Sequence, residues 1–335
     1  MHRSTAAAAT TRLLLAALIA GSALAAGCTT NIATGNRQLD YLSREDEIAI
    51  GEESQPQLTQ EYGGAITDPA INSYITRVAM SMVEHTEGDY RELPWQFTLL
   101  NSDVINAFAL PGGKVFISRA LAEEFTTEAQ LAGVLGHEIG HVTAEHADRS
   151  IQNQLPASVL ATIGGAVAGE SASMQAAVNV LVSGAGTFAL RYSREQENEA
   201  DQLGMRYMTK AGYHPKGMLE VMQVLARATE GAGGPPEWLS THPAPQTRIG
   251  IIRERLDSER YRKQIAAGNL VENEARFQSE FLARLRAVPA PARTERSSRF
   301  DLSDPAGWCW HCARRDALVA AFSSAPVGPD PTLSR

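Results

Sequence analysis

Residues 131–142 read LAGVLGHEIGHV and carry the strongest structural signal of the sequence. Their apolar side chains recur at helical spacing and predict a helix with one buried stripe. They are Leu131, Val134, Leu135, Ile139 and Val142. Upstream, Thr127 followed by Gln130 matches a capping box, which marks a helix N-terminus. The pattern therefore predicts a long helix from about Thr127 to Arg149.

This helix carries two histidines four residues apart, His137 and His141. Four residues turn an α-helix by roughly 400°, so the imidazoles lie about 40° apart on one face and can reach one metal ion. Glu138 lies beside that ion, where it can accept a proton from water. Three glycines also stand in the helix: Gly133, Gly136 and Gly140. Because each costs about 1 kcal/mol against alanine there, we expect a close approach of backbone or ligand.

A zinc site needs a third protein ligand and an open position for water. His146 stands nine residues after His137, roughly 900° around the helix, and is interpreted as an exposed or packing histidine on the opposite face. Residues 192–201, YSREQENEAD, offer a better ligand. Glu197 and Asp201 share a helix face there, so one carboxylate can bind the metal while the other accepts a hydrogen bond from a ligand imidazole. Acids in a first helical turn also favour the helix dipole, which explains Glu195 and Glu199 and is the alternative explanation of Glu197.

The rest of the chain indicates a mostly helical domain. Further helices are predicted over 68–84, 194–211, 215–228 and 245–256. Residues 95–99, 106–110 and 115–117 are predicted to form a small antiparallel sheet. We therefore expect a mainly α fold with a small antiparallel β-sheet (α+β), occupying residues 39–288. Residues 155–190, rich in Ala and Gly, are predicted to form buried or surface-dipping helices rather than a membrane span.

The two ends of the chain are expected to lie outside this domain. The apolar run Leu13–Ala26 is too short to span a bilayer, and it leads into LAAGC at residues 24–28. That ending resembles the lipobox of bacterial lipoproteins, which implies a signal peptide over 1–27, a lipid on Cys28 and a short tether over 28–38. Residues 289–335 are predicted to be a poorly ordered tail. Within the tail, Cys309 and Cys312 are expected to form a disulfide or to have no role.

Composition excludes several classes of protein. The 335 residues are 44% hydrophobic and 20% charged, which is ordinary for a folded globular protein. The formal net charge of −8 leaves no basic excess to neutralise phosphates, so nucleic acid is not an expected partner. Three cysteines are too few for a disulfide scaffold.

Five motifs in a fixed order resemble one family of proteases. They are NAFALPGG at 106–113, HExxH at 137–141, Ser193-Arg194, ExxxD at 197–201, and Thr241-His242-Pro243 with Arg248. Over about residues 40–256 the chain resembles the gluzincin metallopeptidases, and more specifically the family of CAAX prenyl endopeptidases, HtpX and BepA. The resemblance implies that His137, His141 and Glu197 bind one Zn²⁺ per chain. It also implies that Glu138 is the base and that Asp201 supports a ligand.

The same resemblance suggests further site residues. His242 and Arg248 are candidate donors to the reaction's oxyanion, and His242 could instead take the fourth zinc position. An exposed edge strand can pair with an extended peptide through main-chain hydrogen bonds. The candidate substrate-binding residues on that strand are Asn106, Ala107, Phe108 and Ala109; the alternative is that Phe108 and Leu110 are core residues.

The function implied is a zinc endopeptidase of unfolded or misassembled envelope proteins, lipid-anchored through Cys28 at the periplasmic face of the outer membrane. The chain lacks the convincing membrane spans of the CAAX and HtpX members and the repeat domain of the longest periplasmic members. The alternative is a chaperone-like assembly factor for outer-membrane proteins that uses the same groove with little cleavage. A third possibility, an integral membrane protease, requires a span within 155–190. Neither the natural substrate nor the oligomeric state is predicted.

Overall fold

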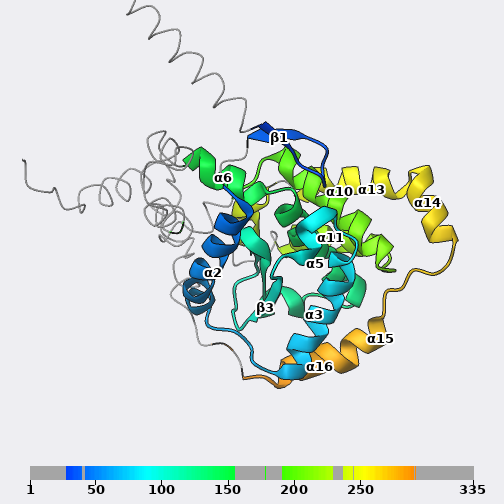
Figure 1. Ribbon diagram of the computed structural model, residues 1–335. Helices are drawn as coiled ribbons and strands as arrows, with labels where there is room; N and C mark the ends of the chain where they lie inside the picture. Colours follow the sequence, from blue (N-terminus) through cyan, green and yellow to red (C-terminus); the bar gives the residue numbers. More distant parts are fainter. Residues whose placement is uncertain are drawn as a thin grey trace, which may run out of the picture.

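The computed structural model describes residues 28–39, 42–154, 178, 191–228, 237–243, 245–289 and 291. Helices pack around a small three-stranded sheet (Figure 1), so the expected mainly α fold with a small sheet is confirmed. The predicted signal peptide, nearly all of 155–190, and Cys309 and Cys312 of the tail lie outside the described residues. Within the described ranges, none of the helices combines the length and apolar character needed to cross a bilayer.

The sheet is mixed, with the strand order β3-β5-β4. Its strands are β3 (Gln96–Leu100), β4 (Ala107–Leu110) and β5 (Lys114–Ser118). β4 and β5 form an antiparallel hairpin through a tight turn at Pro111–Gly113, in which Gly112 and Gly113 have positive φ of 70° and 84°. β3 pairs with β5 in parallel, so the prediction of an antiparallel sheet is wrong for this pair. After β3 the chain reverses into β4, which lies two positions from β3 in the sheet and runs antiparallel to it. β5 then takes the middle position and runs parallel to β3.

The helix that carries HExxH is α5 (Glu128–Thr143), and it lies at the centre of the helical packing. Three helices pack against it: α3 (Pro69–Val83), α10 (Arg194–Lys210) and α11 (Lys216–Ala228). Helix α13 (Pro245–Leu256) packs in turn against α11. These bounds confirm the helices predicted over 68–84, 194–211, 215–228 and 245–256.

Further elements are α2 (Arg44–Glu61), η1 (Gly88–Glu92), α4 (Arg119–Glu123), α12 (Trp238–Thr241), α14 (Glu259–Ala266), α15 (Glu274–Arg276), η3 (Phe277–Leu282) and α16 (Ala283–Ala287).

The three glycines of α5 allow neighbouring backbones to come unusually close. A Cβ on Gly140 would lie 2.8 Å from the carbonyl oxygen of Ala200 in α10. A Cβ on Gly136 would lie 3.2 Å from the carbonyl oxygen of Gly204, and one on Gly133 would lie 3.1 Å from the backbone of α11. The expected close approach is therefore one of backbone to backbone, and it fixes α10 beside the HExxH segment.

The predicted helix to Arg149 is interrupted after Thr143. Helix α6 (His146–Gln154) starts there in a new direction, and the intervening Glu145 has φ of 55°. A non-glycine residue rarely adopts this left-handed conformation, which costs on the order of 1–3 kcal/mol. The surrounding contacts offset that cost, because the buried Glu145 carboxylate accepts hydrogen bonds from three side chains. The donors are Gln38, Arg44 and Tyr90.

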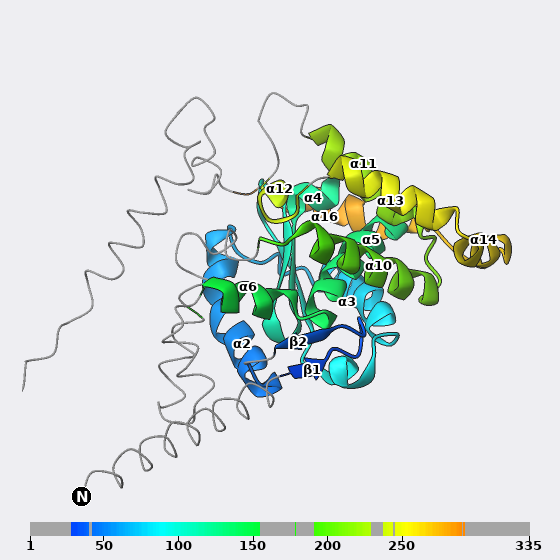
Figure 2. The same cartoon turned by 90° about the horizontal axis from the view of Figure 1, so that it is seen from above.

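Residues 28–39 form part of the packed structure, which differs from the expected tether. β1 (Cys28–Thr30) and β2 (Arg37–Leu39) make a two-stranded antiparallel ribbon that lies beside the helices (Figure 2). The buried side chain of Asn31 donates to the Tyr90 hydroxyl at 2.9 Å and to the Thr143 carbonyl at 3.0 Å. The ribbon is therefore tied to the end of α5, because a polar side chain from it satisfies a carbonyl that the helix leaves open.

Candidate metal centre

Two helices and one loop bring four metal-binding side chains together. α5 supplies His137 and His141, α10 supplies Glu197, and His242 follows α12. The Nε2 atoms of His137 and His141 lie 3.0 Å apart, and the Glu197 carboxylate oxygens lie 3.6 and 3.4 Å from them. Nδ1 of His242 lies 2.8 Å from Oε1 of Glu197 and 3.3 Å from Nε2 of His137. All four side chains are buried, and their donor atoms lie within 4.8 Å of one another.

Both the donor set and the charges of this cluster fit Zn²⁺. Two imidazoles and a carboxylate form a common set of protein ligands at catalytic zinc. Among the described residues, both carboxylate oxygens of Glu138 and Nε2 of His242 are buried without a hydrogen-bond partner, which fits atoms that face a metal ion or its bound water. When ionised, the buried Glu138, Glu197 and Asp201 face the buried guanidinium of Arg248. The two negative charges left over suit a divalent cation, because unpaired buried charge is costly.

Asp201 and Arg248 hold the ligands in place. Oδ1 of Asp201 lies 3.0 Å from Nδ1 of His137, which directs Nε2 of that ring toward the other ligands. Arg248 donates to both oxygens of Asp201, at 2.8 and 2.6 Å, and also to Glu197. Burial raises the pKa of Asp201, but Arg248 outweighs it and lowers the pKa to about 2. The Arg248 guanidinium is thus engaged by carboxylates in this conformation.

Burial has opposite outcomes for Glu197 and Glu138. It raises the pKa of Glu197, but Arg248 and His242 overcome this and hold the pKa well below its usual value. Glu197 is therefore ionised, as a metal ligand has to be. At Glu138, burial outweighs the attraction of His242 and His137, and the pKa is raised. A carboxylate with a raised pKa takes up a proton more readily, which suits a general base.

His146 lies against His141, so its prediction on the opposite face is wrong. The break at Glu145 turns the chain back, and the Nδ1 atoms of the two histidines lie 2.8 Å apart. Nε2 of His146 lies 3.0 Å from Oε2 of Glu199, a residue that sequence reasoning explained by the helix dipole alone. The prediction assumed a straight helix, and Ala144-Glu145 contains no glycine or proline that would signal its end.

Two aromatic residues of the centre were also missed. The ring of Tyr192 stacks on His141, with centroids 3.9 Å apart. The indole of Trp238 stacks on His242 at 4.5 Å, and the Arg248 guanidinium lies 5.0 Å from the Trp238 ring. The available signal was position: Tyr192 directly precedes the Ser193 cap, and Trp238 stands one helical turn before His242.

The candidate substrate-binding residues lie on the outer strand of the sheet but are not exposed. Asn106, Ala107, Phe108 and Ala109 are each 1% exposed. The Phe108 ring stacks on Phe116 of β5, with centroids 4.6 Å apart, and contacts Tyr62 at the end of α2. The expectation of an exposed edge is therefore wrong for this conformation.

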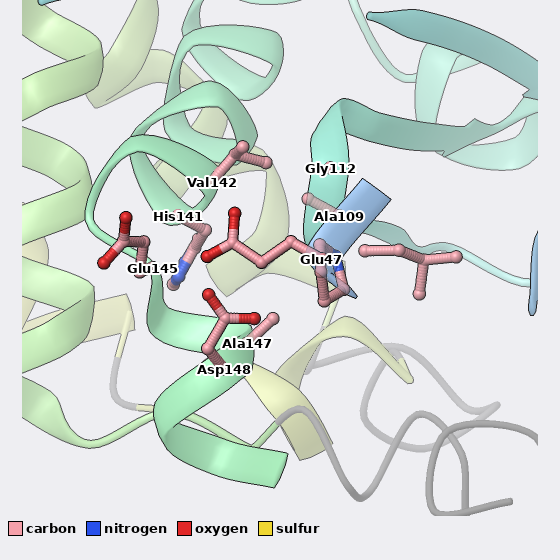
Figure 3. Close-up of a pocket in the computed structure, with 10 residues that line it drawn as sticks. Glu47, Ala109, Gly112, His141, Val142, Glu145, Ala147 and Asp148 are labelled. Atoms are coloured by element: carbon pink, nitrogen blue, oxygen red, sulfur yellow. The ribbon is translucent and has the colours of Figure 1, made fainter. Parts of the chain in front are cut away.

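His141 also lines a small cavity (Figure 3). Its lining includes Glu47, Ala109, Gly112, Glu145 and Asp148. A volume of about 10 Å³ suits one water molecule rather than a peptide. Burial and the neighbouring Asp148 raise the pKa of Glu47. The acids at this cavity form a structural cluster in which the Arg44 guanidinium pairs with Glu47 and Glu145.

Known proteins resemble this chain over the segment that forms the centre. The model of peptidase family M48 matches residues 69–256. The beta-barrel assembly-enhancing protease of Escherichia coli (strain K12) is 33% identical over 223 residues, which is 64% of this chain and 45% of that relative. The mitochondrial metalloendopeptidase OMA1 of Schizosaccharomyces pombe is 26% identical over 234 residues, 69% of this chain and 67% of that relative. Its Arabidopsis thaliana counterpart is 30% identical over 178 residues, 52% and 34% of the two chains.

The extent of these matches decides what they establish. The chain spans less than half the length of the Escherichia coli relative. The family match covers more than half of the chain and includes every residue of the centre from His137 to Arg248. On this ground the chain belongs to peptidase family M48.

Proposed function

We propose that the chain is a zinc-dependent endopeptidase. The observation that carries this is the convergence of His137, His141 and Glu197 on one buried position, beside a Glu138 carboxylate whose oxygens have no hydrogen-bond partner among the described residues. Zn²⁺ held there would supply Lewis acidity toward water and the scissile carbonyl. Membership of peptidase family M48 supports hydrolysis of peptide bonds as the reaction.

Proton transfer and the positioning of the ligands are assigned to side chains of the protein. Glu138 takes the proton of the attacking water and delivers it to the leaving amine. Asp201 orients the His137 ring, and Arg248 keeps both Asp201 and Glu197 ionised. We assign Arg248 to this positioning role in place of the oxyanion, because its guanidinium is engaged by the two carboxylates.

His242 occupies the place of a fourth ligand in this conformation. Its Nδ1 atom lies within hydrogen-bonding distance of Glu197 and near His137 Nε2. A catalytic zinc needs one position open for water, so a ligand there would hold the centre inactive. We propose that His242 turns away when a substrate is cleaved.

The proposed substrates are unfolded or misassembled proteins of the bacterial envelope. Extended peptide would pair with β4 at Asn106–Ala109, and such main-chain pairing depends little on sequence. Because these residues are buried, binding requires the chain that covers them to move. The name of the beta-barrel assembly-enhancing proteases supports an envelope role, and the LAAGC signal supports export and lipid attachment at Cys28 on the periplasmic face of the outer membrane.

The chaperone-like alternative is favoured by one observation, the His242 side chain at the fourth ligand place. A centre held closed would bind unfolded chains in the same groove and seldom cut them. Expression of wild type and of Glu138→Gln in a deletion strain separates the two functions. Equal rescue by both would favour assembly without cleavage.

The direct test measures zinc content and casein cleavage of the purified chain. We expect cleavage that a chelator abolishes and added Zn²⁺ restores. Glu138→Gln is the matched control, because it preserves shape and ligands but removes the base. It should keep its zinc and lose roughly 10²- to 10⁴-fold in rate. Full activity of Glu138→Gln, or activity that resists the chelator, would contradict the proposal.

A further inference from the structure

A chain of hydrogen bonds runs from His141 to the surface of α10. Nδ1 of His141 lies 2.8 Å from Nδ1 of His146, and Nε2 of His146 lies 3.0 Å from Oε2 of Glu199. His141 and His146 are fully buried, whereas Glu199 is partly exposed. The break in the helix at Glu145 is what makes these contacts possible, because it returns His146 to the side of His141.

The chemistry of the three groups fixes where each proton lies. His141 faces the other ligands with Nε2, which lies 3.0 Å from His137 Nε2 and 3.4 Å from Glu197. For Nε2 to bind a metal, the proton of the ring has to be on Nδ1, and that proton is donated to His146. Nδ1 of His146 is then the acceptor, so the proton of His146 is on Nε2 and is donated to Glu199. An ionised carboxylate can only accept hydrogen bonds. Glu199 therefore fixes which group donates and which accepts in each hydrogen bond from His141 to Glu199.

Glu199 is itself held from two other sides. Nδ2 of Asn36, in the turn before β2, donates to Oε1 of Glu199 at 2.7 Å. The guanidinium of Arg149 in α6 lies 3.5 Å from Oε2. Residues from the N-terminal ribbon, α6 and α10 thus meet at one carboxylate, and α5 and α6 connect it to the centre.

We propose that His146 and Glu199 form a positioning relay that fixes the tautomer and orientation of His141 as a zinc ligand. His137 is backed directly by Asp201, and the relay gives His141 the equivalent support through one intervening imidazole. The inference rests on the proposed zinc centre. It assigns to His146 and Glu199 a role in metal affinity that does not require either residue to touch the substrate.

The test is the zinc affinity of the full chain, measured by competition with a chelating dye, with zinc alone as the probe. His146→Leu removes the acceptor and should weaken zinc binding roughly 10- to 100-fold. His146→Asn retains an acceptor near the position of Nδ1 and should recover much of the affinity. Glu199→Leu should also weaken binding, and the double variant His146→Leu with Glu199→Leu should be little worse than His146→Leu alone, since both act through one chain.

The controls separate positioning from packing. Glu195→Leu changes an exposed acid on the same helix and should leave zinc affinity unchanged. Glu199 is partly exposed, so its variant tests the relay even if His146→Leu fails to fold. Two results would overturn the relay. One is unchanged zinc affinity in Glu199→Leu. The other is a zinc affinity of His146→Asn no higher than that of His146→Leu, with a lower melting temperature in both variants. A wild type that binds zinc but never cleaves would refute the endopeptidase and leave the relay measurable by affinity.

Discussion

The candidate ligands His137, Glu197 and His141 are each held in place by a further side chain. Asp201 accepts from His137, and Arg248 binds Glu197 on the side away from His141. Tyr192 stacks on His141 and limits the rotation of that ring. Ligands held in this way lose little freedom on binding a metal, so the geometry is set before the ion arrives.

Glu197→Ala tests the carboxylate at this scale. We expect its zinc content to fall well below one ion per chain, because Glu197 is the one negatively charged side chain of the four-residue cluster, and the three imidazoles left would lie beside the Arg248 guanidinium. The fold should persist, since Arg248 keeps both of its bonds to Asp201. Metal analysis and circular dichroism of the purified variant provide the measurement, with Glu195→Ala as the exposed control on the same helix. A full zinc complement in Glu197→Ala would remove this residue from the ligand set.

His242→Ala distinguishes the two roles considered for His242. If the imidazole fills the fourth position, its removal opens the site and casein cleavage should rise several-fold. If the imidazole instead donates to the oxyanion, its loss should cost roughly 10²- to 10³-fold in kcat. We expect the rise, because Nδ1 of His242 lies among the other ligand atoms. Steady-state kinetics at saturating zinc decide between these outcomes.

In the secondary structure, features that depend on residues close in the sequence were predicted correctly. Features that depend on contacts between distant segments were not. The capping box at Thr127 and the helix Pro69–Val83 are where the sequence predicts them, because neighbours within one turn determine them. The parallel pairing of β3 with β5 depends on which strand takes the middle position, and no local pattern reports that. The end of α5 likewise depends on partners of Glu145 that lie up to 107 residues away.

The same distinction holds within the centre. The spacing of His137 and His141 on one helix is local, so their shared face followed from the sequence. The contact between His146 and Glu199 required both the break after Thr143 and the docking of α10. Neither was visible before the elements were assembled.

The packing of α10 on α5 should be sensitive to a single methyl group. In Gly140→Ala, the new Cβ would lie 2.8 Å from the Ala200 carbonyl oxygen, so the two helices have to separate. We expect a loss of about 1–3 kcal/mol in the free energy of unfolding, together with weaker zinc binding, because α10 carries Glu197. Gly250→Ala in α13 is the matched control: nothing lies within 4 Å of its Cβ. That variant should be stabilised by up to about 1 kcal/mol. Denaturant unfolding curves measure both, and an equal response of the two variants would contradict the packing argument.

In the whole molecule, the N-terminal ribbon connects the proposed lipid anchor to the candidate metal centre. β1 begins at Cys28, and within a few residues Asn31 bonds to α5 and Asn36 bonds to α10. A lipid on Cys28 would therefore hold the metal centre close to the membrane surface, because only a short segment separates Cys28 from these contacts. We expect the proposed peptidase activity to be limited to substrates at or near that surface.

Cys28→Ser tests the attachment itself. A pair of acyl chains gives stable anchoring, whereas without them the described helices offer no segment able to cross the bilayer. After expression in a bacterial host and extraction with alkaline carbonate, we expect wild type to remain with the membranes and Cys28→Ser to enter the soluble fraction. The variant should keep its zinc, since the ribbon contacts made by Asn31 and Asn36 do not involve the thiol. Retention of Cys28→Ser in the carbonate-washed membranes would contradict the lipid as the means of attachment, and so would a soluble wild type.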